Sequence, residues 1–158
     1  MSIRLENCRS EDDENGVLYS VRHDVAKTGT DVPKGEVRFD RCVFAKSKSS
    51  GIRFYSKGRD AVKPVFRDCR IEEACTQRGK SDIFLAYDHR MYVPFDGVDF
   101  GNLKIKQATA HTWFGWDRAK LPVQEAPSEI AGTISLEIPD GSVKTIALNE
   151  EVRQGMFK

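Results

Sequence analysis

Apolar and polar residues alternate in short runs along the first two thirds of the chain, and these runs repeat. Each repeat has two alternating apolar residues, then a cysteine three positions later, then a further apolar position. Copies of this pattern begin at Ile3, Val37 and Pro64, and a fourth begins at Val98 with Leu103 in the cysteine position. A period of two residues is typical of β-strands, so each copy predicts strand structure.

Aligning the four copies gives columns of residues that we expect to face a common interior. The alternation slips once, between the second and third columns, which predicts a two-residue corner of the kind that Asn and Asp favour. The columns are Ile3, Val37, Pro64 and Val98; Leu5, Phe39, Phe66 and Phe100; Cys8, Cys42, Cys69 and Leu103; and Ser10, Phe44, Ile71 and Ile105.

A second alternating run follows in three of the copies, so each repeat carries about three short strands. These runs are Val17–Val21, Ile52–Ser56 and Ile83–Tyr87, preceded by Gly16, Gly51 and Asp82. A unit of this size cannot bury its apolar face alone. Stacking the units at the strand spacing of ~4.8 Å produces a solenoid with one continuous core.

Over about residues 2–107 this pattern resembles the right-handed parallel β-helix of the pectate-lyase-like superfamily. We therefore expect an all-β protein in which residues 1–107 form about four coils and residues 108–158 form a C-terminal cap segment. Within the cap, Thr133–Leu148 predicts a β-hairpin, because Pro139–Ser142 has turn chemistry. An antiparallel β-sandwich is the alternative, since short strands separated by turns also fit that fold.

The overall charge and the cysteine spacing argue against several classes of protein. The 158 residues include 25 Lys and Arg and 24 Asp and Glu, so the chain lacks the basic excess of nucleic-acid binders. No apolar run approaches the roughly 18 residues of a membrane span. The four cysteines have no Cys-x-x-Cys spacing, and stacked cysteines suit a buried packing role better than disulfides. Cys75, in a charged insertion, is interpreted as an incidental exposed thiol.

The resemblance implies a protein that acts on polysaccharides, often acidic ones, at an outward face walled by corner loops. The positions just beyond the second strands are mainly basic, and a basic corner attracts an anionic chain. Arginine can clamp a carboxylate, and a lyase needs both a base and a cation beside a uronate. The residues predicted to act on the substrate are Arg22, His23, Lys57, Arg59, His89 and Arg90.

The segment 108–131 predicts irregular structure and contains a second candidate for sugar binding. Trp113 and Trp116 have ring planes that could stack on sugars, and Arg118 could bond hydroxyl groups. Packing of the tryptophans beneath the cap is the alternative interpretation.

No metal site is predicted and no cofactor is expected, with calcium as the one alternative considered. Calcium takes six to eight oxygen ligands from a fixed geometry. The acidic run Ser10–Asn15 and the carboxylates of Glu6, Asp40 and Asp68 are the candidates, but they do not form a single column.

The first apolar strand begins at residue 3, which predicts a first coil without a cap. Either the chain is a portion of a longer β-helix, secreted or periplasmic, or another chain covers this coil; a chain complete as given would be cytoplasmic. Two functions follow from the sequence. One is binding or processing an acidic polysaccharide, as a lyase or a glycoside hydrolase. The other is a non-catalytic structural or adhesive module that assembles through its uncapped N-terminal coil.

Overall fold

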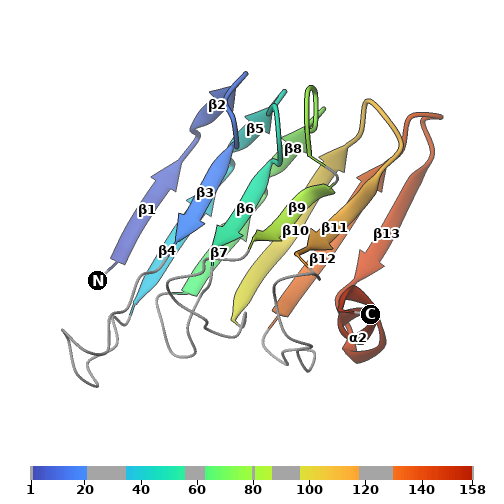
Figure 1. Ribbon diagram of the computed structural model, residues 1–158. Helices are drawn as coiled ribbons and strands as arrows, with labels where there is room; N and C mark the ends of the chain where they lie inside the picture. Colours follow the sequence, from blue (N-terminus) through green and yellow to red (C-terminus); the bar gives the residue numbers. More distant parts are fainter. Residues whose placement is uncertain are drawn as a thin grey trace.

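The protein is built from parallel strands stacked in three sets, followed by a hairpin and a helix (Figure 1). The computed structural model describes residues 2–20, 35–55, 63–79, 81–86, 97–117 and 130–157. The first set comprises β1 (Ser2–Glu6), β4 (Glu36–Asp40), β7 (Lys63–Arg67) and the start of β10 (Val98–Lys106). The second comprises β2 (Arg9–Glu11), β5 (Val43–Ala45), β8 (Arg70–Glu72) and the end of β10. The third comprises β3 (Val17–Ser20), β6 (Ile52–Tyr55), β9 (Ser81–Ala86) and β11 (Thr112–Trp116).

The strand register confirms the columns predicted from the sequence. Leu5 pairs with Phe39, and Phe39 pairs with Phe66, all in parallel strands. In the second set, Ser10, Phe44, Ile71 and Ile105 are successive partners. In the third set, Val17, Ile52 and Ile83 are successive partners. Residues about thirty positions apart therefore lie directly over one another.

Two further strands extend the stacks beyond residue 107. The segment 108–131, expected to be irregular, contains β11, which pairs parallel to β9 with Phe114 opposite Ile83. β12 (Ile130–Glu137) pairs parallel to β10, with Ile134 opposite Leu103. β12 also pairs antiparallel to β13 (Val143–Ala147), which is the hairpin that the sequence predicts.

The corners repeat from coil to coil through left-handed backbone conformations. Between the first and second strands, φ is +54° at Asn7, +51° at Arg41 and +52° at Asp68. In the fourth copy the left-handed residue is Gly101, one position earlier than alignment predicts, and its added Cβ would lie 2.1 Å from the carbonyl oxygen of Phe66. Only glycine fits so close an approach.

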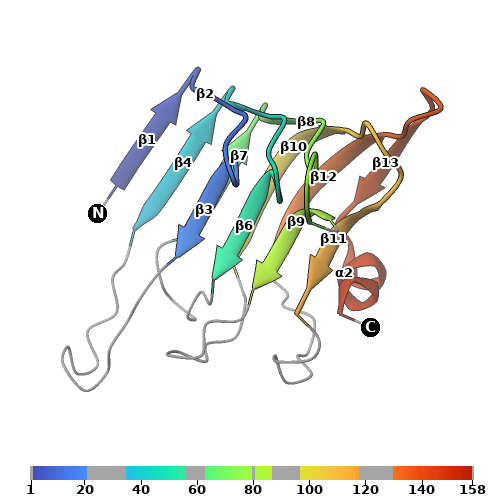
Figure 2. The same ribbon diagram turned by 45° about the horizontal axis from the view of Figure 1, so that its top comes forward.

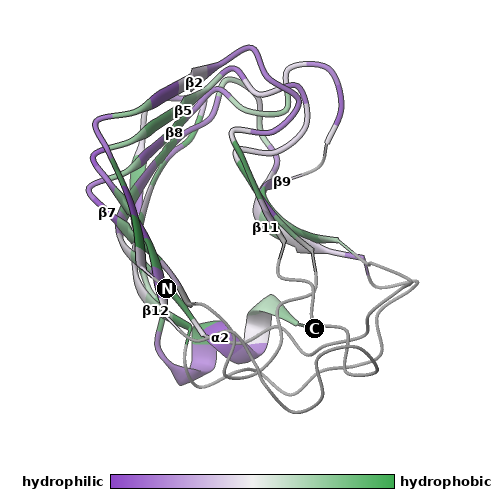
Figure 3. Ribbon diagram, turned by 90° about the vertical axis from the view of Figure 1, so that its left-hand side faces the viewer, coloured by the Kyte–Doolittle hydropathy of each residue, from purple (hydrophilic) through white to green (hydrophobic). Residues whose placement is uncertain are grey.

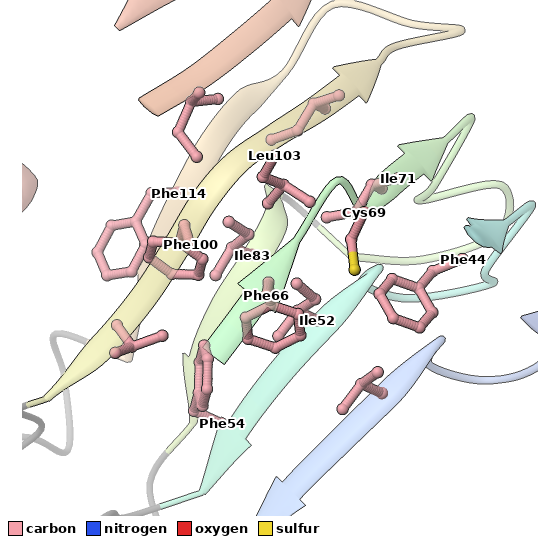
Figure 4. Close-up of a cluster of buried hydrophobic side chains, with 14 of the residues drawn as sticks. Phe44, Ile52, Phe54, Phe66, Cys69, Ile71, Ile83, Phe100, Leu103 and Phe114 are labelled. Carbon is pink, nitrogen blue, oxygen red and sulfur yellow. The ribbon is translucent and has the colours of Figure 1, made fainter. Parts of the chain in front are cut away.

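The core is a ladder of the aligned side chains (Figure 4). The rings of Phe39 and Phe66 are stacked at 4.9 Å, and those of Phe66 and Phe100 at 6.0 Å. The Cys69 thiol donates to the carbonyl oxygen of Phe39 at 3.3 Å, and the Cys42 thiol donates to that of Leu5 at 3.6 Å. Both thiols are fully buried and neither forms a disulfide, so these two cysteines are packing residues.

Viewed along the stack, the two sheets curl around this interior as an open half-barrel (Figure 3). Every strand pair in the described residues is parallel except β12 with β13. The antiparallel β-sandwich considered as an alternative is therefore wrong. Its short strands are present, but apart from the β12–β13 hairpin they pair with the equivalent strands of neighbouring repeats and not with their neighbours in sequence.

The two ends of the stack are different (Figure 2). At the C-terminal end, α2 (Glu150–Met156) has Asn149 as its N-cap, and the Asn149 side chain accepts a hydrogen bond from the Val152 N–H. The residue after α2, Phe157, contacts the rings of Phe114 and Trp116 on β11. At the other end, β1, β2 and β3 are the outermost strands of their sets. No helix in the described part of the chain is long and apolar enough to cross a membrane.

Candidate functional site

The most deeply buried charged pair among the described residues lies between the third and fourth coils. Asp82, the second residue of β9, is fully buried. Its Oδ1 atom lies 3.0 Å from Nε2 of His111, which directly precedes β11. Because β9 and β11 pair with Ser81 opposite Thr112, these two side chains meet across neighbouring coils.

Gln107 completes the arrangement around the carboxylate. Its amide donates to Oδ2 of Asp82 at 2.8 Å and to the carbonyl oxygen of His111 at 2.9 Å. Gln107 itself is almost fully buried at the end of β10. Both oxygens of Asp82 therefore accept a hydrogen bond, which offsets the desolvation cost of an ionised group in the core.

The buried carboxylate changes the protonation of the imidazole. The hydrogen bond with Asp82, then the interaction with Cys75, raises the pKa of His111 from 6.5 to about 10, against the opposing effect of burial. His111 is therefore a cation at neutral pH. Its other ring nitrogen, Nδ1, is buried and has no hydrogen-bond partner among the residues described.

Cys75 lies in the turn between β8 and β9, beside this pair. Its backbone has φ of +62°, and its thiol donates to the carbonyl oxygen of Ser81 at 3.3 Å. The side chain is half-buried.

The basic corner predicted from the sequence lies outside the described residues. This holds for all six residues expected to act on a substrate, which are Arg22, His23, Lys57, Arg59, His89 and Arg90, and for Arg118. The strands that precede them are described, and their last residues are in register: Ser20 is opposite Tyr55, and Tyr55 is opposite Ala86.

Trp113 and Trp116 lie on β11 and are both partly buried against the core. The Trp116 ring is 5.9 Å from that of Phe157, and the Trp113 ring is 5.8 Å from that of Phe114. Trp116 thus packs beneath the C-terminal segment. Stacking of these rings on a sugar stays a prediction.

Two of the acids considered for calcium, Asp40 and Glu6, are paired with arginines. Asp40 accepts from Arg4 at 2.6 Å and from Arg38 at 2.9 Å, and these arginines hold the pKa of its carboxyl below the ordinary value. Glu6 pairs with Arg41. Within the described ranges, no group of three or more His, Cys, Asp or Glu side chains has an arrangement that could hold a metal ion.

Sequence reasoning missed the cluster of Asp82, Gln107 and His111, although two signals pointed to it. Asp82 occupies a column in which the other coils have Gly16 and Gly51. Because glycine in that column indicates close packing, an acid there is expected to be buried. The alternation in Thr112–Trp116 also marks a fourth copy of the second strand. Recognising that copy would have placed Trp113 opposite Asp82 and His111 two positions earlier in the next coil.

Comparisons with known proteins give no relative for the chain. No protein-family model matches it, and no curated protein and no solved structure matches it significantly.

Proposed function

We propose that the chain is a right-handed parallel β-helix module that assembles through its first coil. The observation that carries this proposal is the gradient of exposure along the inward columns of the first two strand sets. Ile3 is 44% exposed, whereas Val98, in the same column three coils later, is fully buried. The right-handed winding is inferred because about 98% of parallel crossover connections have that hand.

The first coil presents the features that a further coil normally covers. Within the described ranges β1, β2 and β3 are the outermost strands of their stacks, and an outermost strand can pair with a further strand. The inward side chain of Leu5 is only partly buried, whereas Phe66, two coils later in the same column, is completely buried. At the opposite end, β13 and α2 follow the last coil.

A second copy of the same chain fits this edge by charge. Arg4 and Glu6 lie two positions apart on β1, on either side of Leu5, and both are exposed. In a twofold, antiparallel pairing of two β1 strands centred on Leu5, each Arg4 faces Glu6 of the other copy. Cross-strand pairs of opposite charge stabilise a sheet, and a twofold interface is self-complementary.

Light scattering coupled to size exclusion tests this assembly over a range of concentrations. The wild-type chain should form a dimer, and Ile3→Lys should be monomeric because it places two charges in the interface. Val143→Lys is the matched control, since Val143 is 64% exposed on β13 at the other end. A wild-type monomer at all concentrations, or a dimer that Ile3→Lys leaves intact, would contradict the proposal.

A second candidate function is binding of an acidic polysaccharide at the edge where β3, β6 and β9 end. The observation that favours it is the register of Ser20, Tyr55 and Ala86, which ends three parallel strands at one level. The six basic residues predicted from the sequence follow these strand ends by two to four positions. Basic residues that follow successive strand ends in the sequence would attract a repeating anionic chain.

Affinity electrophoresis in gels containing polygalacturonate or alginate tests this second candidate. The Arg59→Ala, Arg90→Ala double variant should lose the retardation that the wild-type chain shows. The Arg9→Ala, Arg70→Ala variant removes the same charge from exposed positions on β2 and β8, and it should remain retarded. Equal retardation of all three proteins, or none for the wild type, would exclude this function.

A further inference from the structure

We propose that Arg4 and Glu6 select the partner and the direction of strand pairing at the first coil, and that Asp40 of the second coil positions Arg4 for this role. This selection rests on the assembly through the first coil proposed above. The partner that it selects is a second copy of the chain, because the order of charges on β1 complements its own reverse.

The charged side chains of β1 belong to a pattern that the next strand of the stack repeats. Arg4 and Glu6 are two positions apart in β1, and Arg38 and Asp40 have the same spacing in β4. The parallel register places Arg4 opposite Arg38 and Glu6 opposite Asp40. Like charges directly opposite each other destabilise a sheet, so this parallel pair needs contacts that offset the repulsion.

Diagonal ion pairs between the first two coils supply those contacts. Nε of Arg4 donates to Oδ2 of Asp40 at 2.6 Å, and Nε of Arg38 donates to Oδ1 of the same carboxylate at 2.9 Å. Glu6 pairs with Arg41, which follows β4. The second coil therefore holds both charged side chains of β1.

Asp40 is suited to position Arg4 because the carboxylate is buried and the guanidinium is not. The Asp40 side chain is 4% exposed, against 55% for that of Arg4. Hydrogen bonds between ionised groups are stronger than those between neutral groups, and a surrounding of low dielectric strengthens them further. One nitrogen of the guanidinium is thus fixed, while more than half of the side chain remains accessible to a partner.

The direction of pairing follows from the distances between facing side chains. In an antiparallel pairing centred on Leu5, opposite charges are directly opposed, because Arg4 of each copy faces Glu6 of the other. A parallel copy in the same register would oppose arginine to arginine, and opposite charges would meet only on the diagonal. Directly opposed Cβ atoms are about 5 Å apart and diagonal ones roughly 7–8 Å, so the charges favour the antiparallel pairing.

The same pattern inside the stack provides a matched control. Nε of Arg70 in β8 lies 3.6 Å from Oε1 of Glu72, on either side of the inward Ile71. The Arg4 and Glu6 side chains are also 3.6 Å apart. β8 is paired on one edge with β5 and on the other with β10, so it has no free edge for a second copy.

Charge reversal in the full chain tests the selection by native mass spectrometry, with one protein of each mixture carrying a heavy isotope. Arg4→Glu and Glu6→Arg should each weaken the homodimer by about tenfold or more, because each opposes like charges twice. Mixed together, the two variants should form a heterodimer with nearly wild-type affinity, which also shows that both are folded. Arg70→Glu and Glu72→Arg should each dimerise like the wild type.

A double-mutant cycle on the dissociation constant tests the positioning role of Asp40. Asp40→Asn keeps the shape of the side chain and should weaken the dimer by about threefold, which is within the usual coupling of neighbouring residues. In the Arg4→Ala background the same change should have no further effect, because no guanidinium is left to position. An equal loss in both backgrounds would show that Asp40 acts only on the stability of the coil.

The outcomes separate this selection from the assembly itself. A wild-type chain that stays monomeric would contradict the assembly and the selection together. A wild-type dimer that both charge reversals leave intact would overturn the selection alone. So would reversals whose mixture does not recover, or an equal loss of the dimer in Arg70→Glu.

Discussion

The rings of Phe39 and Phe66 stack face to face, with 4.9 Å between their centroids and 7° between their planes. They are direct partners in the pairing of β4 with β7, so the ring separation is close to the ~4.8 Å spacing of the strands. The repeat in the sequence thus becomes a repeat in space, and the inward side chains of each coil pack directly against those of the next.

Replacing Phe66 by alanine should therefore destabilise the protein by about 3–5 kcal/mol, because Phe66 is fully buried and contacts both neighbouring coils. Chemical denaturation measures the free energy of unfolding. Phe84→Ala is the control, since Phe84 is only partly buried and lies beneath the Arg53 guanidinium. It should cost no more than about 1 kcal/mol. Similar losses in the two variants would contradict the assigned core.

Gly51 allows β6 to lie close to the Ile71 side chain, and a Cβ there would come within 2.5 Å of it. Gly51→Ala should reduce the free energy of unfolding by about 1–3 kcal/mol through overpacking. Gly155→Ala is the matched change in α2, where a Cβ meets no atom within 4 Å. It should stabilise the protein by up to about 1 kcal/mol. Thermal melting of both variants distinguishes the two effects by sign.

The carboxylate of Asp82 should control the titration of His111. In NMR titrations of the imidazole, we expect a pKa of about 10 in the wild type and a value close to 6.5 in Asp82→Asn. Cys75→Ser is the control and should leave the pKa raised, since Asp82 is the larger cause. A value near 6.5 in the wild type would show that the pair does not form.

The same pair makes stability depend on pH in a defined direction. The pKa of His111 is higher in the folded state than in the unfolded state, so its contribution is fully present below about pH 6.5. It is lost as the pH rises through about 10. The excess stability of the wild type over Asp82→Asn should therefore shrink between these values, as measured by urea unfolding at several pH values. A constant difference would contradict the ion pair.

The N-cap of α2 should hold the C-terminal segment on the last coil. Asn149→Ala removes the acceptor of the Val152 N–H, which should cost about 1 kcal/mol. Because Phe157 contacts Trp116, loosening α2 should also alter tryptophan fluorescence before the main unfolding transition. Gln154→Ala, at an exposed position of the same helix, should change neither quantity.

The interior columns could be predicted from the sequence because strand side chains alternate and stacked repeats need similar residues at equivalent positions. Leu5, Phe39 and Phe66 were aligned by that rule alone. The sequence does not predict β11 and β12 as members of the stacks, because 108–131 predicts irregular structure and Thr133–Leu148 predicts only a hairpin. The pairing of each with a strand of the preceding coil decided their place.

The sequence by itself determined a strand-forming, repeating chain with a stacked aromatic and cysteine core. Only the tertiary structure brought Asp82, Gln107 and His111 together, because Asp82 belongs to the third coil and the other two to the fourth, so their contact depends on the register of β9 with β11. Inward apolar positions can be identified from their period in the sequence, which is a local property of the chain. A buried polar cluster has no period, and its members are identified only when folding excludes water from all of them at once.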